Sequence, residues 1–206
     1  MSSGFDLTGK RAFVTGANTG IGQGIAVARA GAGATVACAG RSPMTETLER
    51  ITAAGGSGSE HLADLSDKTA AVALYEAAAS DNGPFDILAN NAGIIRRADA
   101  VDFSEADWDD VLDLNLKTAF FLSQAFGKAA MADDRHAAIV NIASVLSFQG
   151  GIRVASYTAS KHGICGLTRL LACEWAARNV NVNAIAPGYI VSNNTEALRD
   201  DPDRSA

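Results

Sequence analysis

The chain has 206 residues, of which 48% are hydrophobic and 19% charged, and its formal net charge is −6 at pH 7. This length and composition are typical of one soluble globular domain and exclude a disordered or fibrous chain. The acidic balance argues against nucleic acids and anionic membrane surfaces as partners, because the sequence has no basic stripe that would attract them.

The sequence shows no sign of export or of a membrane span. The N-terminal residues MSSGFDLTGKR have no long apolar core, and the apolar runs elsewhere are too short to cross a bilayer. The cysteines Cys38, Cys165 and Cys173 lack the spacing of metal ligands. We therefore expect a cytoplasmic protein with reduced cysteines and no metal site.

Short apolar segments alternate with helical patterns along the chain. The expected strands are residues 11–15, 35–39, 61–64, 85–90, 137–143 and 180–186, and the expected helices are 21–30, 45–54, 69–79, 105–131 and 156–177. The GGSGS sequence at 55–59 is expected to form a turn and loop. Strand-then-helix repetition predicts an α/β fold with a doubly wound parallel sheet, a Rossmann-like three-layer sandwich, in a single domain over 1–206.

A glycine-rich sequence, TGANTGIG at 15–22, follows the first expected strand and opens the first expected helix. Glycine allows a tight turn and a close approach to a pyrophosphate, and the helix N-terminus offers N–H groups to the phosphates. The spacing is G-x3-G-x-G rather than G-x-G-x-x-G, so an ordinary strand-to-helix turn is the alternative. Three glycines in this context favour dinucleotide binding.

The second expected strand ends at Ala39-Gly40-Arg41, without the carboxylate that usually holds the ribose 2′-hydroxyl of NAD. A cation at this place can accommodate the 2′-phosphate of NADP. Alternatively, Arg41 stacks on adenine or faces solvent. The expected cofactor is therefore NAD or NADP.

Tyr157 and Lys161 are four residues apart on an expected helix, so their side chains project from one face. A nearby ammonium favours the phenolate and lowers the pKa of a tyrosine from its usual value of about 10. Ser144 leaves the fifth expected strand at its carboxyl end, where its hydroxyl can hydrogen-bond a substrate oxygen. A Tyr-x-x-x-Lys pair alone is a common surface pattern, but with Ser144 and the glycine turn it predicts an acid/base centre.

The motifs TGANTGIG, NNAG at 90–93, Ser144, YTASK at 157–161 and PG at 187–188 occur in the order found in the short-chain dehydrogenase/reductase family, which the chain resembles from residue 10 to residue 192. The resemblance implies hydride transfer between a nicotinamide cofactor and a secondary alcohol or ketone. Tyr157 would be the general acid/base, Lys161 would lower its pKa and bind the nicotinamide ribose, and Ser144 would position the reacting oxygen. Asn115 falls where the family keeps a helix-kinking asparagine that holds a proton-relay water.

The glycine turn, Arg41 at the end of the second expected strand and the resemblance together give the expected cofactor-binding residues. They are Gly16, Asn18, Thr19, Gly20, Ile21, Gly22, Arg41, Asp64, Leu65, Asn91, Ala92, Gly93, Tyr157, Lys161, Pro187, Gly188, Ile190 and Ser192. Ser192 stands where the family more often has threonine, so the hydroxyl is kept.

Family members usually continue through a substrate-covering helix and a seventh strand, which the 206 residues do not contain. By this resemblance we interpret the polar segment 193–206 as the start of a mobile substrate lid. The long expected helices 105–131 and 156–177 resemble those that pair subunits in the family, which implies a homotetramer.

Three stretches, NNAGIIRR at 90–97, LSFQGGIRV at 146–154 and APGYIVSNNT at 186–195, are similar to those of family members that act on deoxy sugar acids. A sugar acid needs a cation for its carboxylate, and a guanidinium can bind it through two parallel hydrogen bonds. The expected substrate contacts are Ser144, Gln149, Arg96, Arg153 and Tyr157, with Arg97 as a further candidate. Each arginine could instead be a solvated loop charge or part of an intersubunit salt bridge.

Two other functions stay open. The first is a reductase of another polyol or of a 3-oxoacyl thioester, although no basic patch that would dock an acidic acyl carrier protein is evident. The second is a dinucleotide-binding regulator without turnover. The presence of Asn115, Ser144, Tyr157 and Lys161 argues against it.

Overall fold

Six parallel strands form one sheet in the computed structural model, which describes residues 5–188 and 190. The strands are β1 (Arg11–Thr15), β2 (Thr35–Gly40), β3 (Ser57–Leu62), β4 (Ile87–Asn90), β5 (Ala137–Ile142) and β6 (Val180–Ile185). Their order in the sheet is β3-β2-β1-β4-β5-β6, so the direction of winding reverses between β1 and β4. This topology confirms the predicted doubly wound fold, and its reversal point is where such sheets bind ligands.

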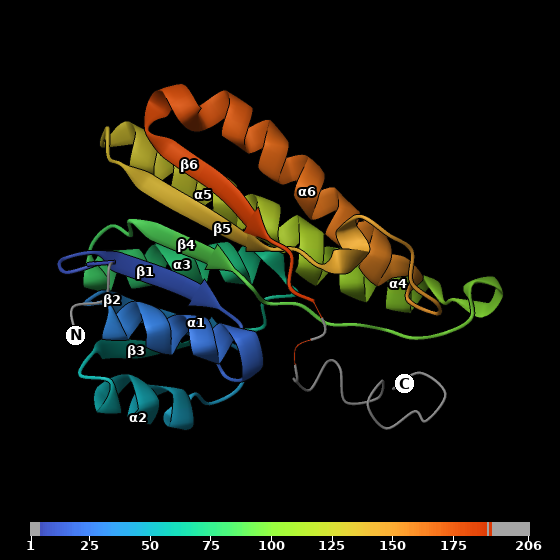
Figure 1. Ribbon diagram of the computed structural model, residues 1–206, viewed down its shortest axis with the longest axis horizontal. Coiled ribbons are helices and arrows are strands. Elements are labelled where there is room, and N and C mark those ends of the chain that lie inside the picture. The colour runs from blue at the N-terminus through green and yellow to red at the C-terminus, as the bar shows by residue number, and fades with distance from the viewer. Residues whose placement is uncertain (1–4, 189, 191–206) are drawn as a thin grey trace.

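Helices cover both faces of the sheet (Figure 1). They are α1 (Gly20–Gly31), α2 (Thr45–Ala53), α3 (Lys68–Asn82), α4 (Glu105–Leu112), α5 (Ala119–Ala132) and α6 (Ala155–Trp175). Alternate residues of β1 serve the two layers, because Ala12 and Val14 pack with α1 and α2 while Phe13 packs with α3 and α5. In the described part of the chain, no helix is long and apolar enough to span a membrane.

The third strand begins earlier than the sequence predicted. Ser57, Gly58 and Ser59 pair with β2, so three of the five residues of the expected GGSGS loop are strand. A Cβ at Gly58 would come within 3.0 Å of the Ile51 side chain, and glycine therefore lets α2 pack closely on this strand. The turn composition of the segment concealed its pairing, because here glycine serves helix packing rather than chain reversal.

The helix expected over 105–131 is divided by a π-helical segment, Asp113–Thr118, that lies between α4 and α5. The segment contains Asn115, whose side chain bonds across to the loop after β4 instead of facing solvent. Single π-helical turns inside α-helices are frequent at functional sites, and this one faces the carboxyl edge of the sheet.

Candidate active site

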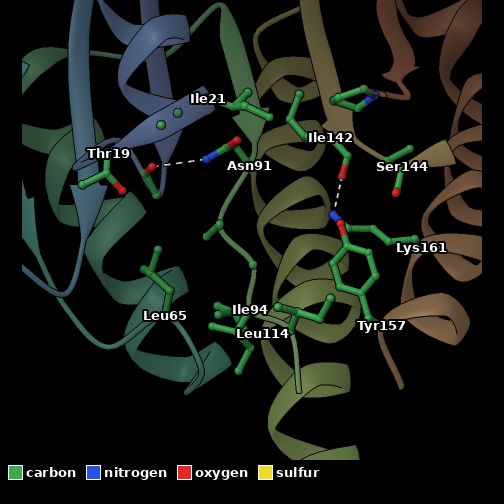
Figure 2. Close-up of a pocket in the computed structure, with 18 of the residues that line it drawn as sticks. Thr19, Ile21, Leu65, Asn91, Ile94, Leu114, Ile142, Ser144, Tyr157 and Lys161 are labelled. Carbon is green, nitrogen blue, oxygen red and sulfur yellow. Dashed lines mark hydrogen bonds between the residues drawn. The ribbon is translucent and has the colours of Figure 1, made fainter. Parts of the chain in front are cut away.

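A cavity of about 560 Å³ lies at the carboxyl ends of the strands (Figure 2). Most residues predicted for the site line it: Gly16, Asn18, Thr19, Gly20, Ile21, Gly22, Arg41, Asp64, Leu65, Asn91, Ala92, Gly93, Arg96, Arg97, Ser144, Tyr157, Lys161, Pro187, Gly188 and Ile190. Asn115, Gln149 and Arg153 are not in its lining, and Ser192 lies outside the described residues. Figure 2 shows Ser144, Tyr157 and Lys161 grouped on one side of the cavity, with Thr19 and Leu65 on the other.

The glycine turn adopts a conformation that depends on its glycines. Gly16 and Gly20 have φ angles of 64° and 56°, which side-chain-bearing residues rarely adopt. A Cβ at Gly22 would overlap the carbonyl oxygen of Gly16. Thr19 makes no side-chain cap to α1, so the first turn of the helix presents its N–H groups without a cap at the cavity wall. These features fit the pyrophosphate of a dinucleotide.

The loop after β4 is fastened to the glycine turn by Thr15 and Asn91. The hydroxyl of Thr15 accepts hydrogen bonds from the backbone N–H groups of Asn91 and Ala92, at 2.9 and 3.0 Å. The Asn91 side-chain amide donates to the carbonyl oxygens of Thr15 and Gly16, at 3.0 and 3.2 Å (Figure 2). The two segments therefore form one continuous wall of the cavity.

Arg41 follows β2, and Asp64 and Leu65 follow β3, so these three residues line the cavity on the side away from Tyr157. Hydrogen bonds from Ser66 hold the pKa of Asp64 below its usual value, and the charge of Arg41 acts in the same direction. The Leu65 carbonyl accepts a 2.8 Å hydrogen bond from Thr118 in the π-helical segment. An exposed arginine and a carboxylate on this side fit the adenosine half of a dinucleotide, with or without a 2′-phosphate.

Lys161 is a buried cation next to Tyr157. Its Nζ donates to the Ile142 carbonyl at 2.5 Å and lies 5.6 Å from the centre of the Tyr157 ring (Figure 2). Burial lowers the pKa of Lys161 to about 8. The side chain therefore keeps a proton at neutral pH but holds it weakly.

The pKa of Tyr157 is raised, because burial disfavours the phenolate. Hydrogen bonding with Ser144 and the charge of Arg97 act in the opposite direction and are the smaller effects. The sequence led us to expect that Lys161 lowers this pKa, but in the structure burial dominates. Tyr157 is therefore protonated at neutral pH, and its role as the acid/base stays a prediction.

Asn115 is buried behind the cavity wall, where its side chain bonds the backbone of Ile94 and the hydroxyl of Ser160. Its Oδ1 accepts from the Ile94 N–H at 2.9 Å, and its Nδ2 donates to the Ile94 carbonyl at 3.0 Å and to Ser160 Oγ at 3.3 Å. Asn115 therefore ties the loop after β4 to the helix that carries Tyr157. Its part in a water relay stays a prediction.

The structure separates the three arginines that the sequence grouped together. Arg153 is exposed and pairs with Asp99 at 3.1 Å, away from the cavity lining. Arg96 lines the cavity but pairs with Asp107 and Asp110 of α4, at 3.3 and 3.0 Å. Arg97 lines the cavity and acts electrostatically on Tyr157. Of this group, Arg96 and Arg97 line the cavity and Arg153 does not.

Sequence reasoning missed the apolar part of the cavity wall. Ile94 and Leu114 lie there (Figure 2), as do Val145 and Leu146 directly after Ser144. Their residue types are those of ordinary core positions, so the only available signal was their closeness in sequence to Gly93, Asn115 and Ser144.

The sequence and the fold both match known dehydrogenases. Residues 10–203 match the model of the short chain dehydrogenase family. The chain is 54% identical over 204 residues to 2-dehydro-3-deoxy-D-gluconate 5-dehydrogenase of Escherichia coli (strain K12), covering 99% of this chain and 81% of that protein. The protein of the same name from Dickeya dadantii (strain 3937) is 53% identical over 201 residues, covering 98% and 79%.

A solved structure from Agrobacterium tumefaciens, provisionally assigned as a 2-deoxy-D-gluconate 3-dehydrogenase with bound NADP, superimposes with a TM-score of 0.91 at 60% identity. The match covers 98% of this chain and 80% of that one.

Proposed function

The chain belongs to the short-chain dehydrogenase family and is an NAD(P)-dependent oxidoreductase acting on CH–OH groups, and we propose that its substrate is a deoxy sugar acid. The reaction is reversible hydride transfer at a secondary alcohol or ketone of a compound such as 2-dehydro-3-deoxy-D-gluconate or 2-deoxy-D-gluconate. The observation that carries the proposal is Arg97, a cation in the wall of the cavity that also holds Tyr157. The names of relatives more than 50% identical support the same substrate class.

The catalytic residues act on the proton that accompanies hydride transfer. When bound, the nicotinamide of the cofactor supplies or accepts the hydride. In reduction, the Tyr157 hydroxyl donates its proton to the carbonyl oxygen, and in oxidation the same atom receives the alcohol proton. The Ser144 hydroxyl hydrogen-bonds the reacting oxygen and orients it. The Lys161 ammonium stabilises the phenolate that Tyr157 becomes after donation.

Arg97 gives the site its preference for an acid. A guanidinium bound to a carboxylate contributes about 1.5–3 kcal/mol when the hydrogen bonds are charge-assisted, which corresponds to about tenfold to a hundredfold in affinity. Arg96 adds less, since Asp107 and Asp110 already occupy its guanidinium. An uncharged polyol lacks the group that Arg97 binds.

The proposal is tested with a panel of hexonates, uncharged polyols and a 3-oxoacyl thioester, each assayed with NAD(H) and NADP(H). We expect turnover of deoxyhexonates to exceed that of polyols. Arg97→Gln should raise KM for the hexonate by about tenfold to a hundredfold. Arg153→Gln is the matched control, because Arg153 lies outside the cavity lining, and it should leave KM within about twofold. Equal activity on uncharged polyols, or equal effects of the two variants, contradicts the assignment of Arg97.

The assembly and the location of the protein stay predictions. Trp108 of α4 and Leu170 of α6 are large apolar side chains that are exposed by 40% and 47%, on the helices that we expect to pair subunits. Light scattering after size exclusion should give the mass of a homotetramer, and cell fractionation should place the protein in the cytoplasm. A monomeric mass contradicts the predicted assembly.

A further inference from the structure

Thr47 lies on α2, directly behind the glycine turn and outside the cavity lining. The residue is fully buried, with 0% exposure. Its Oγ1 donates to the Ala17 carbonyl at 2.8 Å and accepts from the Gln23 side-chain amide at 3.1 Å. Ala17 stands between Gly16 and Asn18, which both line the cavity. Thr47 thus contacts the glycine turn from the side away from the cavity.

Thr47 belongs to a chain of hydrogen bonds that joins three elements. On α2, the Arg50 guanidinium donates to Gln23 Oε1 at 2.5 Å. Gln23 of α1 then donates to Thr47, and Thr47 donates to the turn. Because the Gln23 amide donates to the hydroxyl oxygen, the hydroxyl proton of Thr47 is left to donate to the Ala17 carbonyl. The chain fixes the turn relative to both helices.

The Ala17 carbonyl and the Asn18 N–H belong to one planar trans peptide, since no described peptide bond is cis. A hydrogen bond that fixes the carbonyl therefore also fixes the N–H, which points away from Thr47. We propose that Thr47 is a positioning residue for the cofactor: it holds this peptide plane, and with it the glycine turn, in the orientation that receives the pyrophosphate.

Loss of the Thr47 hydroxyl leaves the Ala17 carbonyl without this partner and allows the peptide plane to rotate. Part of the binding free energy is then used to order the turn, so the affinity for the cofactor falls although no contact to the cofactor is removed. Both dinucleotides carry the same pyrophosphate, so NADPH and NADH are affected alike. The chemistry at Tyr157 is unchanged, so kcat at saturating cofactor and its pH profile stay as in the wild type.

The test measures dinucleotide affinity directly, by fluorescence titration of NADPH and of NADH, together with thermal unfolding. Thr47→Val should raise both Kd values by about fivefold to tenfold. Thr47→Ser, which restores the hydroxyl, should keep both Kd values within about twofold of the wild type. Thr52→Val is the matched control, because Thr52 is an exposed threonine on the same helix whose hydroxyl bonds only to the Leu48 carbonyl within α2.

A lowered Tm for Thr47→Val with wild-type Kd for both dinucleotides would show a purely structural role and overturn the proposal. If Thr47→Val does not fold, Thr47→Cys takes its place, since cysteine is a small side chain whose thiol is only a weak donor. This variant should raise both Kd values at least about threefold. Wild-type affinity for it also overturns the proposal.

Discussion

Replacing Lys161 with methionine should stabilise the folded protein while abolishing turnover. Lys161 is 5% exposed, and burial lowers its pKa from 10.5 to about 8. This shift corresponds to about 3 kcal/mol of destabilisation of the folded state at pH values where the lysine is charged. Methionine fills the same space but loses the hydrogen bond to the Ile142 carbonyl, which offsets about 1–2 kcal/mol. The net gain is about 1–2 kcal/mol.

The effect has a definite pH dependence. Because the folded pKa is below the unfolded value, the unfolded state binds more protons between pH 8 and 10.5. The stability of the wild type therefore rises with pH through this window, and below pH 8 the penalty is fully present. The variant has no such group, so its advantage is largest below pH 8, falls to zero within this window, and becomes a deficit of about 1–2 kcal/mol above pH 10.5, where only the lost hydrogen bond to Ile142 remains.

The assay is urea and thermal unfolding of both proteins at pH values below, within and above this window. Below pH 8, Tm of Lys161→Met should exceed that of the wild type by about 3–6 °C. Lys128→Met is the control, because Lys128 is exposed on α5 and its replacement should change Tm little at any pH. A variant less stable than the wild type below pH 8, or a difference independent of pH, refutes the reasoning.

Three further changes test other parts of the site. Asn115→Leu leaves the Ile94 N–H and carbonyl without their Asn115 partners. In urea titrations it should lower the free energy of unfolding by about 2–4 kcal/mol. Wild-type stability would show that these bonds contribute nothing. Gly22→Ala places a Cβ against the Gly16 carbonyl and should raise Kd for NADPH at least about tenfold. Unchanged affinity would mean that the turn accommodates the methyl group. Arg41→Ser should raise KM for NADP about tenfold and leave KM for NAD nearly unchanged, and equal effects on both would exclude Arg41 as the 2′-phosphate contact.

The parallel sheet could be predicted from the sequence, because its strands and helices have clear local patterns. Continuous apolar strands alternating with helices predict a parallel sheet, because such strands are covered on both faces. The start of β3 was not readable, since Gly58 serves packing under Ile51 rather than a turn. A kink at Asn115 was implied by the family resemblance, but the π-helical form of Asp113–Thr118 was not, because it depends on the loop that Asn115 binds, about twenty residues earlier in the chain.

The glycine turn after β1 and the Tyr157–Lys161 pair on α6 could be predicted because each lies in one short motif, and Ser144 because it follows β5 at the carboxyl end of the sheet. The arginines show the limit of this reasoning. Arg96, Arg97 and Arg153 are equivalent by type and by predicted loop position. Only the folded chain brings Asp107 and Asp110 to Arg96 and Asp99 to Arg153, and places Arg96 and Arg97, but not Arg153, in the cavity wall.

Tyr157→Phe tests the central assignment most directly, because it keeps the ring and removes only the proton donor. Turnover of a deoxyhexonate and Kd for NADPH are measured on the same preparation. We predict a fall in turnover of about a thousandfold with Kd within about twofold of the wild type. Turnover within about tenfold of the wild type would contradict the role of Tyr157 as the acid/base of the reaction.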